Sequence, residues 1–93
     1  MSLDYDFTQK LKFKIIKLKK KDRKRADILH KKIKQIINLK APEIQHFKNL
    51  KHGLSDRKRV RTDKSFVLTF KFNSKEKSIL FIDFDHHNNI YKK

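Results

Sequence analysis

Alternating apolar and polar side chains between residues 57 and 84 constrain the fold of this chain more than any other feature. Three stretches there are rich in β-branched and aromatic residues, namely RKRVRT, SFVLTFKFN and KSILFIDF. This composition and alternation are typical of β-strands. A polar connection of hairpin length, residues 73–77, separates the second stretch from the third. We therefore predict a small antiparallel sheet in this part of the chain.

Successive side chains of a strand point to opposite faces of its sheet, so each face follows from the sequence. In the second stretch one face is entirely apolar: Phe66, Leu68, Phe70 and Phe72. In the third stretch Leu80, Ile82 and Phe84 share one face, opposite Ile79, Phe81, Asp83 and Asp85. We expect the all-apolar faces to pack, together with Val60, on helices. The other face then carries Arg57, Arg59, Arg61, Asp83, Asp85 and, just beyond them, His87.

Two apolar stripes at helical spacing occupy the first forty residues. The first stripe is Phe7, Leu11, Ile15 and Leu18, and the second is Ala26, Leu29, Ile33, Ile36 and Ile37. Thr8 is suited to cap the first helix, Asp22 lies where one helix could end and the next begin, and Pro42 marks or follows the end of the second. We predict an α+β fold, a helical hairpin packed on one face of a twisted antiparallel sheet of three to four strands, with residues 1–93 as one domain.

The charge of the chain is extreme for its length. It has 26 Lys and Arg residues against 10 Asp and Glu residues, a formal net charge of +16. Such a charge favours an anionic partner, with nucleic acid ahead of an acidic protein and an anionic membrane third. The charge is clustered in KLKFKIIKLKKKDRKR, residues 10–25, and the candidate RNA contacts there are Lys17, Lys20, Lys21, Arg23 and Lys24.

Several site classes are disfavoured by the composition. The chain has no cysteine, which excludes disulfides and thiolate metal sites. No apolar run is long enough to span a membrane, and we expect a cytoplasmic protein that has no membrane partner. Asp83, Asp85, His86 and His87 are close in sequence, but strand alternation divides them between two faces, so we expect no metal and no cofactor.

Arg59 and Arg61 are two residues apart on a strand, so their guanidinium groups project the same way. Each can grip a phosphate with two hydrogen bonds. Cleavage of RNA by its own 2′-hydroxyl passes through a phosphorane, whose extra negative charge needs such donors. The alternative is that these arginines only anchor a substrate or pair with Asp83 and Asp85.

His87 is the best candidate for acid–base chemistry, since an imidazole exchanges protons near neutral pH. His86 and His87 should point to opposite sides if the chain there is extended. Tyr91, four residues further on, is suited to stack on a base or to orient the substrate. The alternative for His87 is an ordinary surface histidine.

The order of these parts resembles the RelE/ParE superfamily of toxins. The resemblance covers nearly the whole chain and is carried by LKHGLSDRKRVRTDKSFVLTFKF, ILFIDFDHHNNIY and the terminal H-x-x-x-Y. In the RelE and YafQ branches this fold cleaves mRNA in the ribosomal A site without a metal, and a cognate antitoxin wraps the toxin. ParE-like members poison DNA gyrase instead.

The resemblance also implies roles for individual residues. Arg59 and Arg61 match the strand positions that hold the scissile phosphate, His87 matches the C-terminal catalytic histidine of YafQ-like members, and Tyr91 matches the terminal aromatic. The basic helices resemble the part that contacts ribosomal RNA. Further candidate contacts that position the RNA are Lys51, His52, Lys58 and Lys64.

The sequence departs from the family pattern at three places. Val67 stands where many members have an arginine, and Ser65 stands where YafQ-like sequences have an acidic residue, with Asp63 two positions earlier. The N-terminal strand is limited to about LDYDF. The general base is therefore left open.

We expect the toxin of a toxin–antitoxin pair, acting as a ribosome-dependent, metal-independent endoribonuclease. Its partners would be mRNA, the ribosome and a small acidic antitoxin. The alternatives are a non-enzymatic RNA- or ribosome-binding protein and a gyrase-inhibiting toxin.

Overall fold

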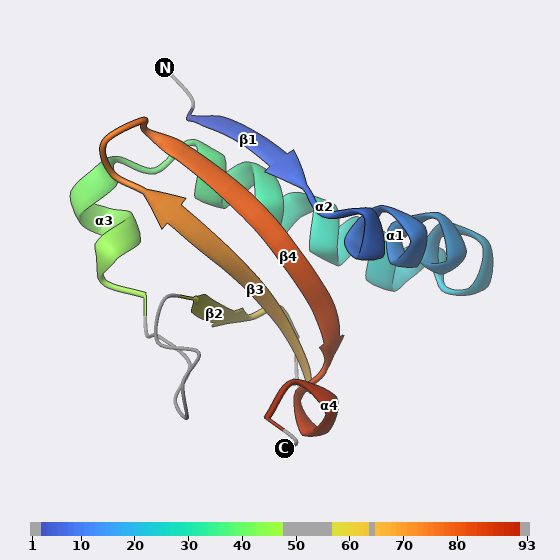
Figure 1. Cartoon of the computed structure of the whole chain (residues 1–93). Helices are drawn as coiled ribbons and strands as arrows, with labels where there is room; N and C mark the ends of the chain where they lie inside the picture. Colours follow the sequence, from blue (N-terminus) through green and yellow to red (C-terminus); the bar gives the residue numbers. More distant parts are fainter. Residues whose placement is uncertain (1–2, 48–56, 64, 92–93) are drawn as a thin grey trace.

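A layer of helices covers one side of a four-stranded sheet (Figure 1). The computed structural model describes residues 3–47, 57–63 and 65–91, with the backbone alone at Tyr91. The elements in chain order are β1 (Asp4–Phe7), α1 (Gln9–Lys21), α2 (Arg23–Ile37), α3 (Ala41–Gln45), β2 (Lys58–Arg61), β3 (Phe66–Asn73), β4 (Ser78–His86) and α4 (His87–Tyr91). The predicted α+β fold, helices first and strands after them, is confirmed. None of the helices in the described ranges is long and apolar enough to cross a membrane.

The strands lie in the order β1-β4-β3-β2. β2 pairs with β3 and β3 with β4 in antiparallel fashion, as predicted, whereas β1 runs parallel to β4. A parallel pair needs a long connection between its strands, and here α1, α2 and the other strands supply it. The short LDYDF segment therefore becomes an edge strand of a mixed sheet.

The predicted helical hairpin is present, and its caps are those expected from the sequence. The Thr8 hydroxyl accepts a hydrogen bond from the Leu11 N–H at 3.2 Å, which caps α1. Asp22 ends α1 through its own N–H, which donates to the Leu18 carbonyl, and its carboxylate caps α2 by accepting from the Arg25 N–H. Because Thr8 starts the helix at Gln9, Phe7 lies in β1, and its assignment to the first helical stripe was wrong.

The five residues predicted as the second stripe are all buried on α2. α2 ends at Ile37, and Pro42 lies beyond it, in the first turn of α3, a short helix that the sequence did not predict. The Glu43 carboxylate accepts from the Lys40 N–H at the start of α3. α3 closes one end of the core, because Ile44 is fully buried.

A β-bulge in β4 determines which of its side chains enter the core. Leu68 pairs with Phe84, but the register shifts after Thr69, so that Phe70 pairs with Phe81 and Ile82 is passed over. Each inserted residue reverses the alternation beyond it. The prediction that Leu80 and Ile82 share the core face with Phe84 is therefore wrong. The buried residues of β4 are instead Ile79, Phe81 and Phe84.

The polar connection between β3 and β4 is a hairpin turn, as predicted. The Asn73 side-chain oxygen accepts hydrogen bonds from the backbone N–H groups of Lys75 and Glu76. Lys77 then closes the turn with φ 54°, in the left-handed region that favours glycine.

Replacing Lys77 by glycine should stabilise the fold. Removing the Cβ relieves the left-handed strain, and we expect the free energy of unfolding to rise by up to about 1 kcal/mol. Chemical denaturation monitored by circular dichroism measures the change. Lys75→Gly, in the same turn without a positive φ, should lower stability slightly. A loss of stability in Lys77→Gly as large as that in Lys75→Gly would contradict this account.

Candidate functional site

The face of the sheet that carries Arg59 and Arg61 of β2 is here called the arginine face. Arg59 lies opposite Thr69 of β3, which lies opposite Asp83 of β4. Arg61, Val67 and Asp85 form the neighbouring row. Directly opposed residues in an antiparallel sheet share a face. The sheet therefore has two arginines at one margin and two carboxylates across β3, the grouping expected from the alternation.

The opposite face of the same strands belongs to the core. Val60 pairs with Leu68 and packs against the buried cluster, as predicted. Lys58 pairs with Phe70, so it lies on this core side and not with the arginines. Its ammonium donates to the backbone carbonyls of Gln45 and Phe47 at the end of α3. The structure thus separates Lys58, expected to position RNA, from Arg59 and Arg61, because the pleat turns odd and even residues to opposite sides.

The middle of the arginine face is closed off from solvent. Val67 and Thr69 are only 2% and 3% exposed, and the Thr69 hydroxyl donates to the Asp83 carbonyl. Their neighbours across the sheet are the charged residues of β2 and β4. An anion bound beside the arginines would therefore meet guanidinium groups over a poorly hydrated floor, where charge–charge interactions are stronger than in water.

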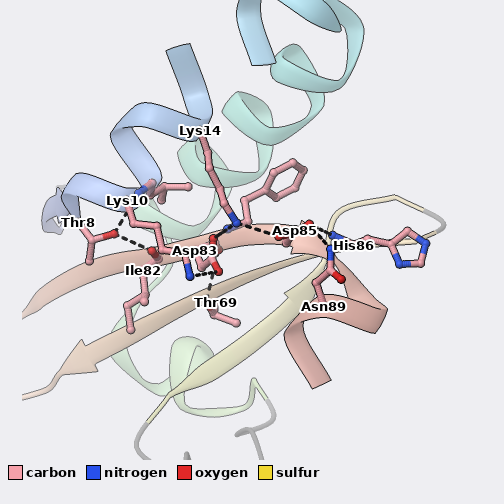
Figure 2. A network of polar contacts seen from close by, with 11 residues as sticks. Thr8, Lys10, Lys14, Thr69, Ile82, Asp83, Asp85, His86 and Asn89 are labelled. Carbon is pink, nitrogen blue, oxygen red and sulfur yellow. Dashed lines mark hydrogen bonds and ion pairs between the residues drawn. The ribbon is translucent and has the colours of Figure 1, made fainter. Parts of the chain in front are cut away.

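Two lysines from α1 hold the carboxylates of the arginine face (Figure 2). The Lys14 ammonium lies 2.7 Å from Asp83 Oδ1 and 2.8 Å from Asp85 Oδ2. Lys10, one turn earlier, lies 3.2 Å from the second oxygen of Asp83. From the other side, the Asn89 amide of α4 donates to Asp85 Oδ1 at 3.0 Å. These contacts, called here the Lys14 network, join α1, β4 and α4.

The Lys14 network shifts two pKa values in opposite directions. Burial by itself would raise the pKa of the Asp85 carboxyl, but hydrogen bonds from Lys14, Asn89 and the His86 backbone outweigh burial and hold the pKa below its ordinary value. Burial by itself would lower the pKa of the Lys14 ammonium, but the hydrogen bonds and charges of Asp83 and Asp85 outweigh it and raise the pKa.

His87 lies at the same end of the sheet as Arg61, attached to the turn that follows β2. Its backbone N–H donates to the Ser65 carbonyl at 2.7 Å. In the same turn the Asp63 carboxylate accepts from Arg25 of α2 at 3.4 Å and from the Ser65 N–H at 3.3 Å. The turn between β2 and β3 therefore fixes the backbone of His87 relative to the arginine strand.

His86 and His87 were expected to point to opposite sides if the chain there is extended, and the chain is not extended at His87. β4 ends at His86 and α4 begins at His87, so strand alternation stops between them. The two imidazole rings stack, with centroids 4.8 Å apart and an interplanar angle of 25°. Nδ1 of His87 is buried and has no hydrogen-bond partner within the described part of the chain. Proton exchange between His87 and a bound molecule would therefore use Nε2.

The remaining candidates divide into exposed residues and residues that lie outside the described ranges. The basic residues at the junction of α1 and α2 are all exposed: Lys17, Lys20, Lys21, Arg23 and Lys24. Tyr91 is the last residue of α4. Lys51, His52 and Lys64 lie outside the described residues. Within residues 3–47, 57–63 and 65–91, no group of three or more His, Asp or Glu side chains could hold a metal ion.

Sequence reasoning missed Lys10 and Lys14 as partners of the acidic pair. The only signal for them is their spacing of four residues, which places both on one side of a helix. That spacing cannot indicate which strand lies beneath. The contact from Asn89 to Asp85 was missed for the same reason, since it depends on β4 ending at His86.

The Lys14 network should make stability depend on pH. An acid with a lowered pKa stabilises the fold above its unfolded value of about 3.9 and loses that contribution as pH falls, while a lysine with a raised pKa loses its contribution only above about pH 10.4. Lys14→Ala should therefore lower the free energy of unfolding by about 1 kcal/mol at pH 7, since the pair is only partly screened by water. The loss should be smaller at pH 3, which lies below the unfolded pKa of about 3.9 and closer to the lowered pKa of Asp85.

Denaturant titrations at pH 7 and pH 3 measure this difference. Lys12→Ala, at an exposed position of the same helix, is the matched control and should change little at either pH. Equal destabilisation by Lys14→Ala at both pH values would show that packing, rather than the ion pairs, holds α1 on β4.

Known proteins resemble this chain in sequence and in fold. No family model matches it. A protein of Methanocaldococcus jannaschii named "Putative toxin RelE4" is 48% identical over 77 residues, which cover 83% of this chain and 78% of that protein. An uncharacterised protein of Methanosarcina mazei is 39% identical over 78 residues, 84% of this chain and 86% of its own length.

Solved structures of toxins share the fold. YafQ from Escherichia coli superposes with a TM-score of 0.73 at 16% identity, covering 96% of this chain and 98% of its own. The toxin–antitoxin complex RelBE2 from Mycobacterium tuberculosis contains a chain with a TM-score of 0.69 at 15% identity, covering 92% of this chain and 99% of its own. The sequence relative and these folds agree: the protein belongs to the RelE-like toxin superfamily.

Proposed function

We propose that this toxin is a metal-independent endoribonuclease that cleaves mRNA on the ribosome, acting in the cytoplasm as a single domain of residues 1–93. The observation that carries the proposal is the neighbourhood of Arg59 and Arg61 on one face, with the backbone of His87 held by the turn that follows Arg61. This arrangement places hydrogen-bond donors for a phosphate, and a side chain that can carry a proton, at one end of the sheet.

The reaction would be attack of the substrate's own 2′-hydroxyl on the adjacent phosphate, which breaks the bond to the 5′-oxygen of the next nucleotide and leaves a 2′,3′-cyclic phosphate and a 5′-hydroxyl. Arg59 and Arg61 stabilise the phosphorane as its charge develops. His87 transfers a proton through Nε2, because Nδ1 is buried. Tyr91 orients the substrate or stacks on a base. Asp63 is engaged by Arg25, and the identity of the general base is left open.

The exposed lysines and arginines at the junction of α1 and α2 supply a second surface, for ribosomal RNA. Ribosome binding would align the mRNA strand with the arginine face, which reduces the entropic cost of reaching the reactive geometry. Contacts of this kind are sensitive to salt, because they release counterions from the RNA.

An acidic antitoxin is the second partner in this proposal. The structural neighbours include the toxin–antitoxin complexes RelBE2 and DinJ–YafQ; a structure of the latter has a chain with a TM-score of 0.72 at 18% identity, covering 98% of this chain and 99% of its own. This chain has a groove of about 500 Å³ between β1 and the helical hairpin. Its apolar lining includes Phe7, Ile15, Leu29, Ile33 and Ile37. Exposed basic residues also line it: Lys19, Arg23 and Lys34. An acidic amphipathic helix complements such a groove.

Removal of His87 or Arg61 should abolish toxicity. We expect the wild-type protein, expressed alone, to arrest growth and to produce codon-phased cuts in mRNA. His87→Ala and Arg61→Ala should each reduce the cleavage rate by about 10²–10³-fold. The first variant lacks the side chain that transfers a proton, and the second lacks a cation that stabilises the phosphorane. Primer extension on a reporter mRNA measures the cuts.

Two control variants test whether the loss of any imidazole ring, or of any positive charge, has the same effect on cleavage. His46→Ala removes an exposed histidine at the end of α3, and Lys75→Ala removes a cation from the β3–β4 turn; both should cleave normally. Salt-sensitive RNA binding without cuts would favour a non-enzymatic RNA-binding protein, and DNA damage with intact mRNA would favour a gyrase inhibitor.

Charge reversal in the groove should weaken antitoxin binding. Lys19→Glu combined with Lys34→Glu places two carboxylates opposite the acidic partner, and we expect the dissociation constant to rise about tenfold. Calorimetric titration with the cognate antitoxin measures it. Lys12→Glu combined with Lys31→Glu makes the same charge change at exposed positions outside the groove. Equal weakening by both pairs would mean that net charge, and not the groove, governs binding.

A further inference from the structure

A column of stacked side chains runs from α2 to the first residue of α4. The guanidinium carbon of Arg25 lies 4.1 Å from the centroid of the Phe66 ring. Phe66 meets the His86 ring edge-on at 5.7 Å and 75°, and His86 stacks on His87 at 4.8 Å and 25°. These four residues are called here the ring column. Because each plane restricts the next, the orientation of the His87 imidazole depends on groups on three other elements.

The far end of the ring column is rigidly held. Arg25 is paired with Asp22 at 2.9 Å and with Asp63 at 3.4 Å. Phe66 stacks on Phe84, a core residue that is 4% exposed, with ring centroids 5.3 Å apart and an interplanar angle of 26°. The column is therefore anchored both to the core and to the junction of α1 and α2.

The orientation of the His86 ring is restrained by a hydrogen bond as well as by its aromatic neighbours. Its Nδ1 accepts a hydrogen bond from the Asn88 N–H at 3.2 Å. A flat ring held in this way can lie against the His87 ring and restrict its rotation.

We propose that His86 is a positioning residue for His87. Its ring, held by Phe66 and by the Asn88 N–H, fixes the plane of the His87 imidazole, and with Nδ1 of His87 enclosed, Nε2 is the nitrogen presented to the substrate. The inference rests on the proposed function, in which His87 transfers the proton. It adds that the aromatic plane of His86, and not its nitrogens, is what the reaction requires.

Three variants of His86 distinguish the contribution of its aromatic plane from the contributions of its side-chain volume and of its ring nitrogens. His86→Phe keeps an aromatic plane, His86→Leu keeps bulk without a plane, and His86→Ala removes both. In cleavage assays on programmed ribosomes, we expect kcat to fall about ten- to a hundredfold in the Leu and Ala variants, since a small misplacement of a catalytic group has this effect. KM should stay unchanged, and His86→Phe should retain kcat within about threefold.

Each result of these assays supports or contradicts the role of His86. A wild-type kcat in His86→Leu and His86→Ala, with His87→Ala inactive, would overturn the role of His86 and leave the proposed function intact. Loss of kcat in His86→Phe equal to that in His86→Leu would also overturn it, because the nitrogens would then be required. Absence of cleavage by the wild-type protein would overturn the proposed function and this inference together.

A measurement that does not depend on activity tests the same stack. In the wild-type protein the carbon-bound protons of the His87 ring should resonate upfield of an unstacked histidine, because of the ring current of His86. The upfield shift should persist in His86→Phe and vanish in His86→Leu. Thermal unfolding of each variant verifies that it is folded, and an unchanged shift in folded His86→Leu would contradict the proposal.

Discussion

The pairing of β3 with a strand on each side determines how the rest of this toxin is arranged. Leu68 and Phe70 are completely buried on the helix side, and this burial fixes the pleat of the central strand. Every side chain directly opposite an odd-numbered residue at this end of β3 must then lie on the arginine face, as Arg59, Arg61, Asp83 and Asp85 do. A slip of one residue would bury four charged groups, so hydrophobic burial maintains the composition of the arginine face.

Electrostatics then decides what that face can bind. In a chain of net charge +16, two carboxylates beside two arginines could cancel the attraction for an anion. The Lys14 network instead surrounds Asp83 and Asp85 with ammonium and amide donors from α1 and α4. The same contacts hold the end of β4, after which His87 begins α4. Stabilisation of the fold and placement of the candidate site therefore depend on the same ion pairs.

Local chemistry explains which parts of this arrangement could be predicted from the sequence. The caps at Thr8 and Asp22, the α2 stripe and the β3–β4 turn depend on residues close together in the chain, and all were predicted. The core face of β4 was mispredicted because alternation carries no sign of the bulge at Ile82. The stacking of His86 on His87 was missed because it depends on where a strand ends. Lys10 and Lys14 look like other lysines of a basic helix, and only the tertiary fold pairs them with Asp83 and Asp85.

The parallel pairing of β1 with β4 has a consequence for the order in which the fold is completed. Phe7 pairs with Phe81, so one edge of the sheet joins segments that are far apart along the chain. Contacts so distant along the chain form late and slowly. Until β4 joins the sheet, the lysines of α1 lack the carboxylates of Asp83 and Asp85. We expect the Lys14 network, and with it the placement of His87 after β4, to be completed only at the end of folding.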